Sequence, residues 1–149
     1  MLDPWYITGY CDGEAVFTYS RARGSFGLYF AVKQREDNHW IIDKIQEYFK
    51  YVGRIYQGKE SRRGEKGGLS KPYIYYRVTK INQLQVIIDH FDKYPLQSKK
   101  KLETYNLWRE MAIHKVENYR KADYDKLRAL AEKLSGLNSQ SRAFKVRKK

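Results

Sequence analysis

Spacings of three and four between apolar residues, typical of a helix with one buried face, mark three segments of the chain. Residues 38–49, 82–91 and 99–116 are therefore predicted to be helices. Asn38 and Asn82 stand where a helix N-cap is expected. The predicted buried positions are Trp40, Ile41, Ile42, Ile45, Tyr48 and Phe49; then Leu84, Ile87, Ile88 and Phe91; then Leu102, Tyr105, Trp108, Met111 and Ala112.

Glycine and proline mark the ends of these helices. Gly53 is predicted to end the first helix. The second helix is predicted to break at Tyr94-Pro95, because the residue before a proline disfavours the helical conformation. A short last helix is predicted from Tyr124 to Leu134, stopped by Gly136.

Alternating apolar and polar residues predict two hairpins between the helices. Val16–Ser20 and Leu28–Lys33 form the first, with the turn Arg-Ala-Arg-Gly-Ser between them. Arg54–Gln57 and Pro72–Val78 form the second, joined by a long basic, glycine-rich loop over residues 58–70.

The N-terminal segment has a less usual pattern. Asp3 as N-cap and Pro4 at the first helical position predict a helix from Pro4 to Asp12. Gly9 and Gly13, four residues apart, lie on one face, where a second helix could approach closely. The apolar helix runs directly into two carboxylates, those of Asp12 and Glu14, without a polar turn, which is an unusual way for a helix to end.

The order helix, hairpin, helix, hairpin, helices predicts an α+β fold: a four-stranded antiparallel sheet with helices on one face and the other face free. At 149 residues, one domain is expected. We assign residues 1–134 to this domain and residues 135–149 to a basic C-terminal tail, which either follows a nucleic-acid backbone or is disordered.

Charge is concentrated in two segments. Of the net +13, residues 54–80 carry +6 and residues 135–149 carry +5. Such a distribution predicts a surface that binds a polyanion, DNA or RNA, and favours this interpretation over a charged surface that only promotes solubility. The single cysteine, Cys11, is expected in the core, which excludes an intrachain disulfide and a cysteine-rich zinc site. No segment has the length and apolarity of a membrane span, and no signal peptide is recognised, so an intracellular protein is expected.

Three blocks resemble the LAGLIDADG homing endonucleases. Ile7–Ala15 occupies the nine positions of the motif that names the family, with Gly13-Glu14 at its end. His90–Lys100 looks like the family's turn into a basic helix, and Phe30–Gln34 resembles its strand with a polar active-site residue. The resemblance covers about residues 5–115 and implies the αββαββα form of the fold. A single copy of the motif implies a homodimer, joined through Tyr6, Gly9, Tyr10 and Gly13.

By this resemblance, the chain is expected to cut double-stranded DNA at a long, nearly palindromic site during intron homing, with Mg²⁺ or Mn²⁺. Glu14 and the carbonyl of Gly13 would hold the metal. Gln34 would position water, and either Lys99 or Lys100 would lie near the scissile phosphate. Asp12 is expected to be structural.

Base reading is expected from the free face of the sheet, in the major groove. Alternation places only about half of the polar strand residues there. The candidate DNA-binding residues are Thr18, Ser20, Arg21, Arg23, Tyr29, Lys33, Arg54, Tyr56, Lys59, Arg62, Arg63, Lys71, Tyr73, Tyr75 and Arg77.

Two other readings stay open. One is a non-cleaving protein of the same fold, either a maturase that binds intron RNA or a DNA-binding protein. The other is a general basic RNA-binding domain, which would leave the opening motif without a purpose. The expected compartment is an organelle, chloroplast or mitochondrion, or a bacterial cytoplasm.

Overall fold

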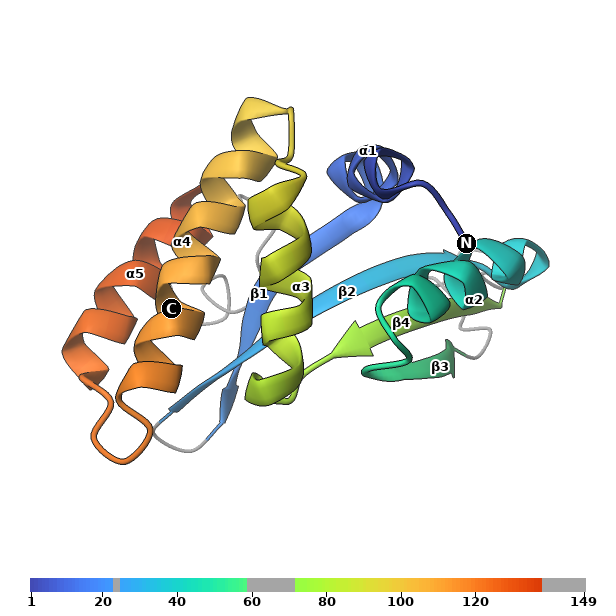
Figure 1. Cartoon of the computed structure of the whole chain (residues 1–149). Helices are drawn as coiled ribbons and strands as arrows, with labels where there is room; N and C mark the ends of the chain where they lie inside the picture. Colours follow the sequence, from blue (N-terminus) through green and yellow to red (C-terminus); the bar gives the residue numbers. More distant parts are fainter. Residues whose placement is uncertain (23–24, 59–71, 138–149) are drawn as a thin grey trace, which may run out of the picture.

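The computed structural model describes residues 1–22, 25–58 and 72–137 (Figure 1). Its elements follow the predicted order of helices and hairpins. They are α1 (Pro4–Glu14), β1 (Ala15–Ala22), β2 (Ser25–Arg35), a short 3-10 turn (Glu36–Asn38), α2 (His39–Tyr48), β3 (Arg54–Gly58), β4 (Tyr73–Val78), α3 (Ile81–Lys93), α4 (Lys99–Glu117) and α5 (Tyr124–Leu137).

The four strands form one antiparallel sheet in the order β1-β2-β4-β3. Both predicted hairpins are present, with Phe17 paired to Phe30 in the first and Tyr56 to Tyr75 in the second. The hairpins are joined by the pairing of β2 with β4. The predicted fold class is thereby confirmed.

Strict alternation gives the sheet one buried and one free face. In β2 every second residue from Phe26 to Val32 is buried, and β4 buries Ile74, Tyr76 and Val78. The helices cover this face, as Figure 1 shows. Phe17 lies at its centre, with its ring 5.1 to 5.3 Å from the rings of Phe91, Tyr105 and Trp108. Aromatic packing of this kind contributes beyond the area it buries.

Three sequence predictions about helices are wrong in detail. Trp40 was expected inside but is 53% exposed, because it lies one residue before the buried stripe that begins at Ile41. Asn82 is not a cap, since α3 already begins at Ile81 after Lys80. Gly136 does not stop α5, which continues to Leu137; a helix tolerates one glycine at a cost of about 1 kcal/mol.

The connection from α2 to β3 requires a glycine. The helix itself ends at Tyr48, and Gly53 follows in the left-handed region with φ of 75°. A Cβ at this position would lie 2.5 Å from the carbonyl oxygen of Arg77. Gly53 therefore allows the chain to turn closely past β4. Among the described helices, none combines the length and apolarity that crossing a membrane would take.

Candidate active site at the end of α1

Helix α1 leads directly into the sheet. The carboxylate of Asp3 accepts a 2.8 Å hydrogen bond from the amide of Trp5, and Pro4 opens the helix, as predicted. The helix ends at Glu14, two residues later than predicted, and Ala15 already belongs to β1. No loop separates the two elements, so Glu14 has its backbone held from both sides.

A polar network fixes the inner face of α1. The hydroxyl of Thr8 donates to the carbonyl of Tyr94 at 2.7 Å and lies 2.9 Å from Nε2 of His90. Because that hydroxyl has one proton, His90 must donate from Nε2, and its Nδ1 accepts from the hydroxyl of Tyr48 at 2.9 Å. Burial lowers the pKa of His90 to about 4, which keeps the ring neutral.

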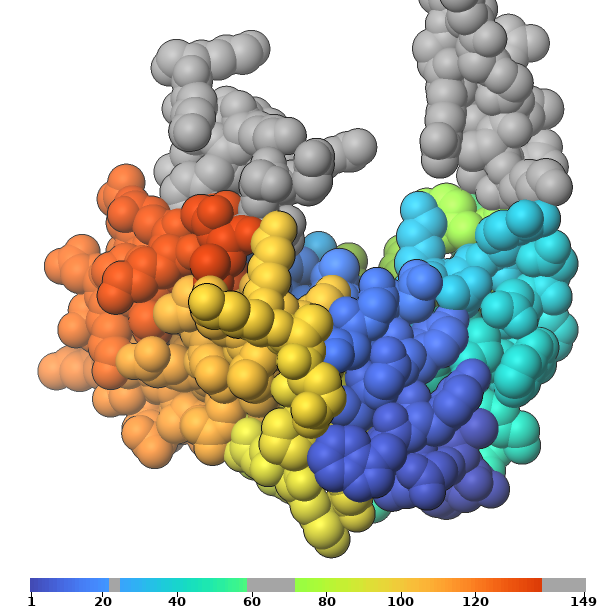
Figure 2. Space-filling view, turned by 90° about the horizontal axis from the view of Figure 1, so that it is seen from above, coloured from blue at the N-terminus to red at the C-terminus, as the bar shows by residue number. Residues whose placement is uncertain are grey.

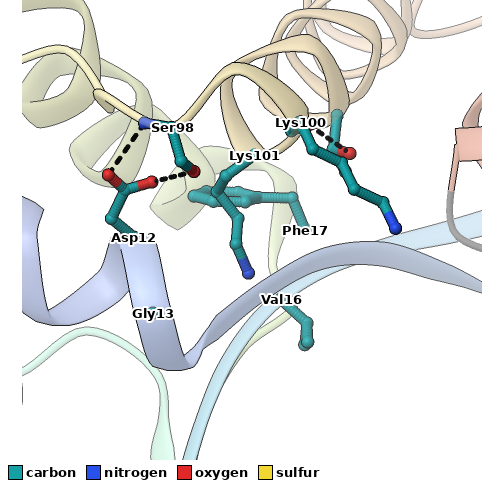
Figure 3. A pocket seen from close by; sticks show the side chains of 8 residues that line it. Asp12, Gly13, Val16, Phe17, Ser98, Lys100 and Lys101 are labelled. Atoms are coloured by element: carbon teal, nitrogen blue, oxygen red, sulfur yellow. Dashed lines mark hydrogen bonds between the residues drawn. The ribbon is translucent and has the colours of Figure 1, made fainter.

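Asp12 holds the same face one turn later. Its carboxylate accepts hydrogen bonds from the amides of Gln97 at 3.2 Å and Ser98 at 2.9 Å, and from the hydroxyl of Ser98 at 2.6 Å. These bonds tie α1 to the start of α4 (Figure 3). These contacts agree with the predicted structural role of Asp12. They hold the start of α4 and do not cap α1, the helix that contains Asp12.

A pocket lies between the end of α1, the start of β1 and the first turn of α4. Figure 3 shows its lining, which is Asp12, Gly13, Val16, Phe17, Ser98, Lys100, Lys101 and Thr104. Gly13 and Glu14 are both exposed beside it. Within the described part of the chain, the Glu14 carboxylate has no hydrogen bond and no ion pair, so it is available for a ligand.

Lys101 contacts the junction of α1 and β1 directly, and the sequence analysis did not predict it. Its ammonium donates to the carbonyl oxygen of Ala15, the residue after Glu14. Burial lowers its pKa, while the carboxylates of Asp12 and Glu14 act in the opposite direction. Helical spacing carried the signal: Lys101 precedes the buried residues Thr104 and Trp108 by three and seven positions, which places it on the inner face.

The two predicted lysines differ in position. Lys100 lines the pocket and Lys99 does not, although both are exposed. In Figure 3 the side chain of Lys101 points towards the junction of α1 and β1, whereas the ammonium of Lys100 points along the strands.

Gln34 lies on the core-facing side of β2, two residues beyond the pair formed by Ala15 and Val32. It therefore lies under the end of α1, next to Tyr10. Burial, assisted by the charge of Glu14, raises the pKa of Tyr10 to about 12, and the Gln34 amide opposes this shift. The structure thus brings Gln34 close to the motif helix.

The outer face of α1 is largely uncovered by the described residues: Tyr6, Gly9 and Gly13 are exposed, whereas Tyr10 packs against the core. Tyr6, Gly9, Tyr10 and Gly13 follow one another at spacings of three, one and three, which makes a single stripe. Tyr6 is 47% exposed, and a Cβ added at Gly9 or Gly13 would meet no atom within 4 Å. Figure 2 shows α1, in blue, facing the viewer uncovered between residues 94–100 and α2.

The candidate DNA-binding residues divide into three groups by their position in the structure. Nine lie on the free face of the sheet by alternation: Thr18, Ser20, Tyr29, Lys33, Arg54, Tyr56, Tyr73, Tyr75 and Arg77. Arg21 instead alternates with the buried residues of β1, and its guanidinium carbon lies 5.4 Å from the ring centre of Phe26. Arg23, Lys59, Arg62, Arg63 and Lys71 lie outside the described residues, as does the predicted tail beyond residue 137.

Solved structures resemble this fold. The LAGLIDADG meganuclease I-AabMI bound to uncleaved DNA is 28% identical and superposes with a TM-score of 0.69 over 87% of this chain and 44% of its own. I-SmaMI, bound to an uncleaved DNA target in the presence of calcium ions, is 21% identical with a TM-score of 0.70 over 94% of this chain and 50% of its own. The second likeness shows the fold alone.

A curated relative from Podospora anserina, an uncharacterized 50.9 kDa protein in ND4 intron 1, is 28% identical over 123 residues, which are 75% of this chain and 24% of the relative. The chain thus spans a quarter of this relative and about half of the two solved structures. The family model for LAGLIDADG endonucleases matches residues 7–112, including the motif helix, the sheet and the start of α4. The chain belongs to the LAGLIDADG endonuclease family.

Proposed function

We propose that this chain is a site-specific DNA endonuclease that makes double-strand breaks at a long, nearly palindromic target by metal-dependent hydrolysis. The observation that carries the proposal is the exposed, unpaired carboxylate of Glu14. It lies at the helix-to-strand junction beside the partly buried Lys101, at the edge of a basic sheet face. A protein that only binds nucleic acid gains nothing from a free carboxylate held against phosphate.

The donor set fits half of a divalent-metal site. Glu14 and the exposed Gly13 carbonyl offer the hard oxygen ligands that Mg²⁺ or Mn²⁺ prefers. No group of three or more potential side-chain ligands occurs in the described residues, so one copy supplies only part of a coordination sphere. When bound, the metal would lower the pKa of water and stabilise charge on the phosphate oxygens.

The remaining roles go to the chain's own groups. Lys101, held at the carbonyl of Ala15, places an amine beside Glu14, and its lowered pKa suits the transfer of a proton. Lys100 faces the same pocket and contributes charge, and Gln34 orients solvent from below the helix. Lys99 is left outside this arrangement.

Pairing through the outer face of α1 completes the site. Apolar and aromatic residues occupy both sides of this helix, a pattern typical of a helix that is buried on both sides. A homodimer would bring two Glu14 carboxylates together, one for each DNA strand, with both free sheet faces on the same side. This chain covers about half the length of each of the two solved structures. A second motif helix within a longer chain would therefore complete the site as well as a second copy would.

Double-stranded DNA is the proposed partner of the free face. Its described residues include Lys33, Arg54 and Arg77, and Arg35, which is paired with Asp37 beyond the end of β2; no acidic side chain lies among them. Phosphate contacts from such cations release counterions and provide salt-dependent affinity. Since the relative from Podospora anserina is named for an intron, we also propose intron homing and an organelle as the compartment, with a bacterial cytoplasm as the alternative.

The second candidate, a maturase that binds intron RNA, is favoured by that same intron location. The two functions differ in one measurable property, metal-dependent DNA cutting.

The test is incubation of the purified chain with supercoiled DNA that carries the intron insertion site of the host gene. We expect linear DNA with Mg²⁺ and none with EDTA. Glu14→Gln should slow cutting by at least about 100-fold while the dissociation constant for the target stays within about threefold.

Glu110→Gln is the matched control, because Glu110 is an exposed acid on α4 that lies away from the pocket. It should cut at the normal rate. Normal cutting by Glu14→Gln would refute the catalytic assignment. Specific RNA binding without DNA cutting would favour the maturase.

A further inference from the structure

One arginine on the free face, Arg77, lies against an aromatic ring. The guanidinium carbon of Arg77 lies 3.8 Å from the ring centre of Tyr29, at stacking distance. Directly opposite Arg77 in β2 is Ala31, whose methyl group leaves the arginine free to lean towards Tyr29, two residues away on the same face.

The donors of this arginine are unused. Its Nε is buried and has no hydrogen-bond partner in the described residues, and none of those residues forms an ion pair with the guanidinium. Across the other ladder, Arg77 is paired directly with Arg54, a second cation. Like charges opposite one another destabilise a sheet, so this arrangement is costly in the free protein and is relieved by an acceptor from outside.

Stacking on the ring determines what kind of acceptor fits. The ring of Tyr29, 3.8 Å away, restricts the rotation of the guanidinium, whose donors share one plane. Because Nε is buried, the two terminal nitrogens are the donors open to a ligand. A planar fork of this kind matches the two major-groove acceptors of guanine, O6 and N7. Lys33, 3.9 Å from the ring centre of Tyr73, is held similarly but offers a point charge, which suits phosphate better.

We propose that Arg77 reads a guanine in each half of the DNA target and that Tyr29 is the positioning residue that holds it for this contact. The proposal rests on the proposed duplex DNA partner but not on cleavage. It distinguishes Arg77 from Arg54, which is exposed on the edge strand and is expected to contact phosphate without reading sequence.

The experiment selects duplexes from a randomised DNA library with the wild-type chain, with Ca²⁺ in place of Mg²⁺. The wild type should enrich a guanine at one position per half-site. Arg77→Gln should reduce this preference at least about fivefold without changing the other positions. Arg77→Lys should retain most of the affinity and lose the preference, because a lysine cannot form the fork.

Tyr29 and Arg54 provide the controls. Tyr29→Phe should keep the preference, whereas Tyr29→Leu should weaken it, since only the ring is required. Arg54→Gln should lower affinity equally for all sequences and reduce the slope of log K against log salt by about 1. Circular dichroism melting of each variant checks that the sheet is intact.

Unchanged base preferences in Arg77→Gln, with only weaker binding, would overturn the inference and make Arg77 a phosphate contact. Preferential selection of RNA over duplex DNA would also overturn it. A chain that selects guanine through Arg77 but never cuts with Mg²⁺ would instead refute the endonuclease and leave this inference standing.

Discussion

The two faces of α1 differ in almost every property. On the inner face, Ile7 and Cys11 are fully buried, and the polar groups of Thr8 and Asp12 all have partners in the segment from His90 to Ser98. On the outer face, Tyr6, Gly9 and Gly13 are exposed, and Tyr10 is the member of the stripe that packs against the core. The inner face of this helix therefore contributes to the fold of a single copy, and the outer face is the one that we propose joins a second motif helix.

The largest expected effect comes from the inner face. Ile7→Ala removes a fully buried side chain and should lower the free energy of unfolding by about 3 kcal/mol, from lost burial and the cavity left behind. Urea denaturation measures it. Tyr6→Ala, one residue away on the outer face, should change the same quantity for the monomer by about 0.5 kcal/mol or less. Equal losses in the two variants would break the comparison.

A second prediction uses the neutral His90. Its pKa is lowered in the folded chain to about 4 and is near 6.5 when unfolded, so the unfolded chain binds the extra proton first. The stabilisation is complete above about pH 6.5 and is lost as the pH falls towards 4. It amounts to about 2–3 kcal/mol.

Urea denaturation of wild type and His90→Gln at a series of pH values tests this. The difference between the two should shrink as the pH falls through the window from 6.5 to 4. A constant difference would show that His90 titrates normally and does not hold α1 as a neutral ring.

The smallest effect is a gain. Since a Cβ at Gly9 meets no atom within 4 Å, Gly9→Ala should stabilise the monomer by about 0.5–1 kcal/mol through helix propensity alone. Gly9→Leu should instead weaken self-association, because its side chain separates the paired helices. Analytical ultracentrifugation measures the second effect, and unchanged sedimentation of Gly9→Leu would contradict pairing through this face.

The sequence predicted the features that depend on neighbouring residues and missed those that depend on contacts between residues far apart in the chain. The periods of three to four and of two located α2, α3, α4 and both hairpins, because they reflect burial of a local face, whereas α1 was located by its N-cap Asp3 and by Pro4. The sheet order was not predicted beyond its hairpins, since the pairing of β2 with β4 joins residues far apart in the sequence, from Arg35 and Tyr73 to Phe30 and Val78. Cys11 was correctly expected in the core, and burial raises the pKa of its thiol.

The site shows the same limit. The motif indicated Glu14 and Gly13, yet the run from Lys99 to Lys101 offered three similar cations, and only packing separates them. Lys101 is distinguished by its hydrogen bond to the carbonyl of Ala15, a contact across 86 positions. Arg21 was predicted to bind DNA, but in β1, which begins at Ala15, it is on the same face as the buried residues Phe17 and Tyr19.

Because no linker separates Glu14 from Ala15, the end of α1 is at a fixed distance from every residue of β1. If the chain is the endonuclease proposed above, the residue that cuts the DNA backbone and the strand that contacts its bases belong to one continuous segment without a flexible linker. A single residue inserted there would send every side chain of β1 to the opposite side of the sheet. In the proposed endonuclease, the distance between the cutting site and the base contacts would therefore be fixed by the covalent chain.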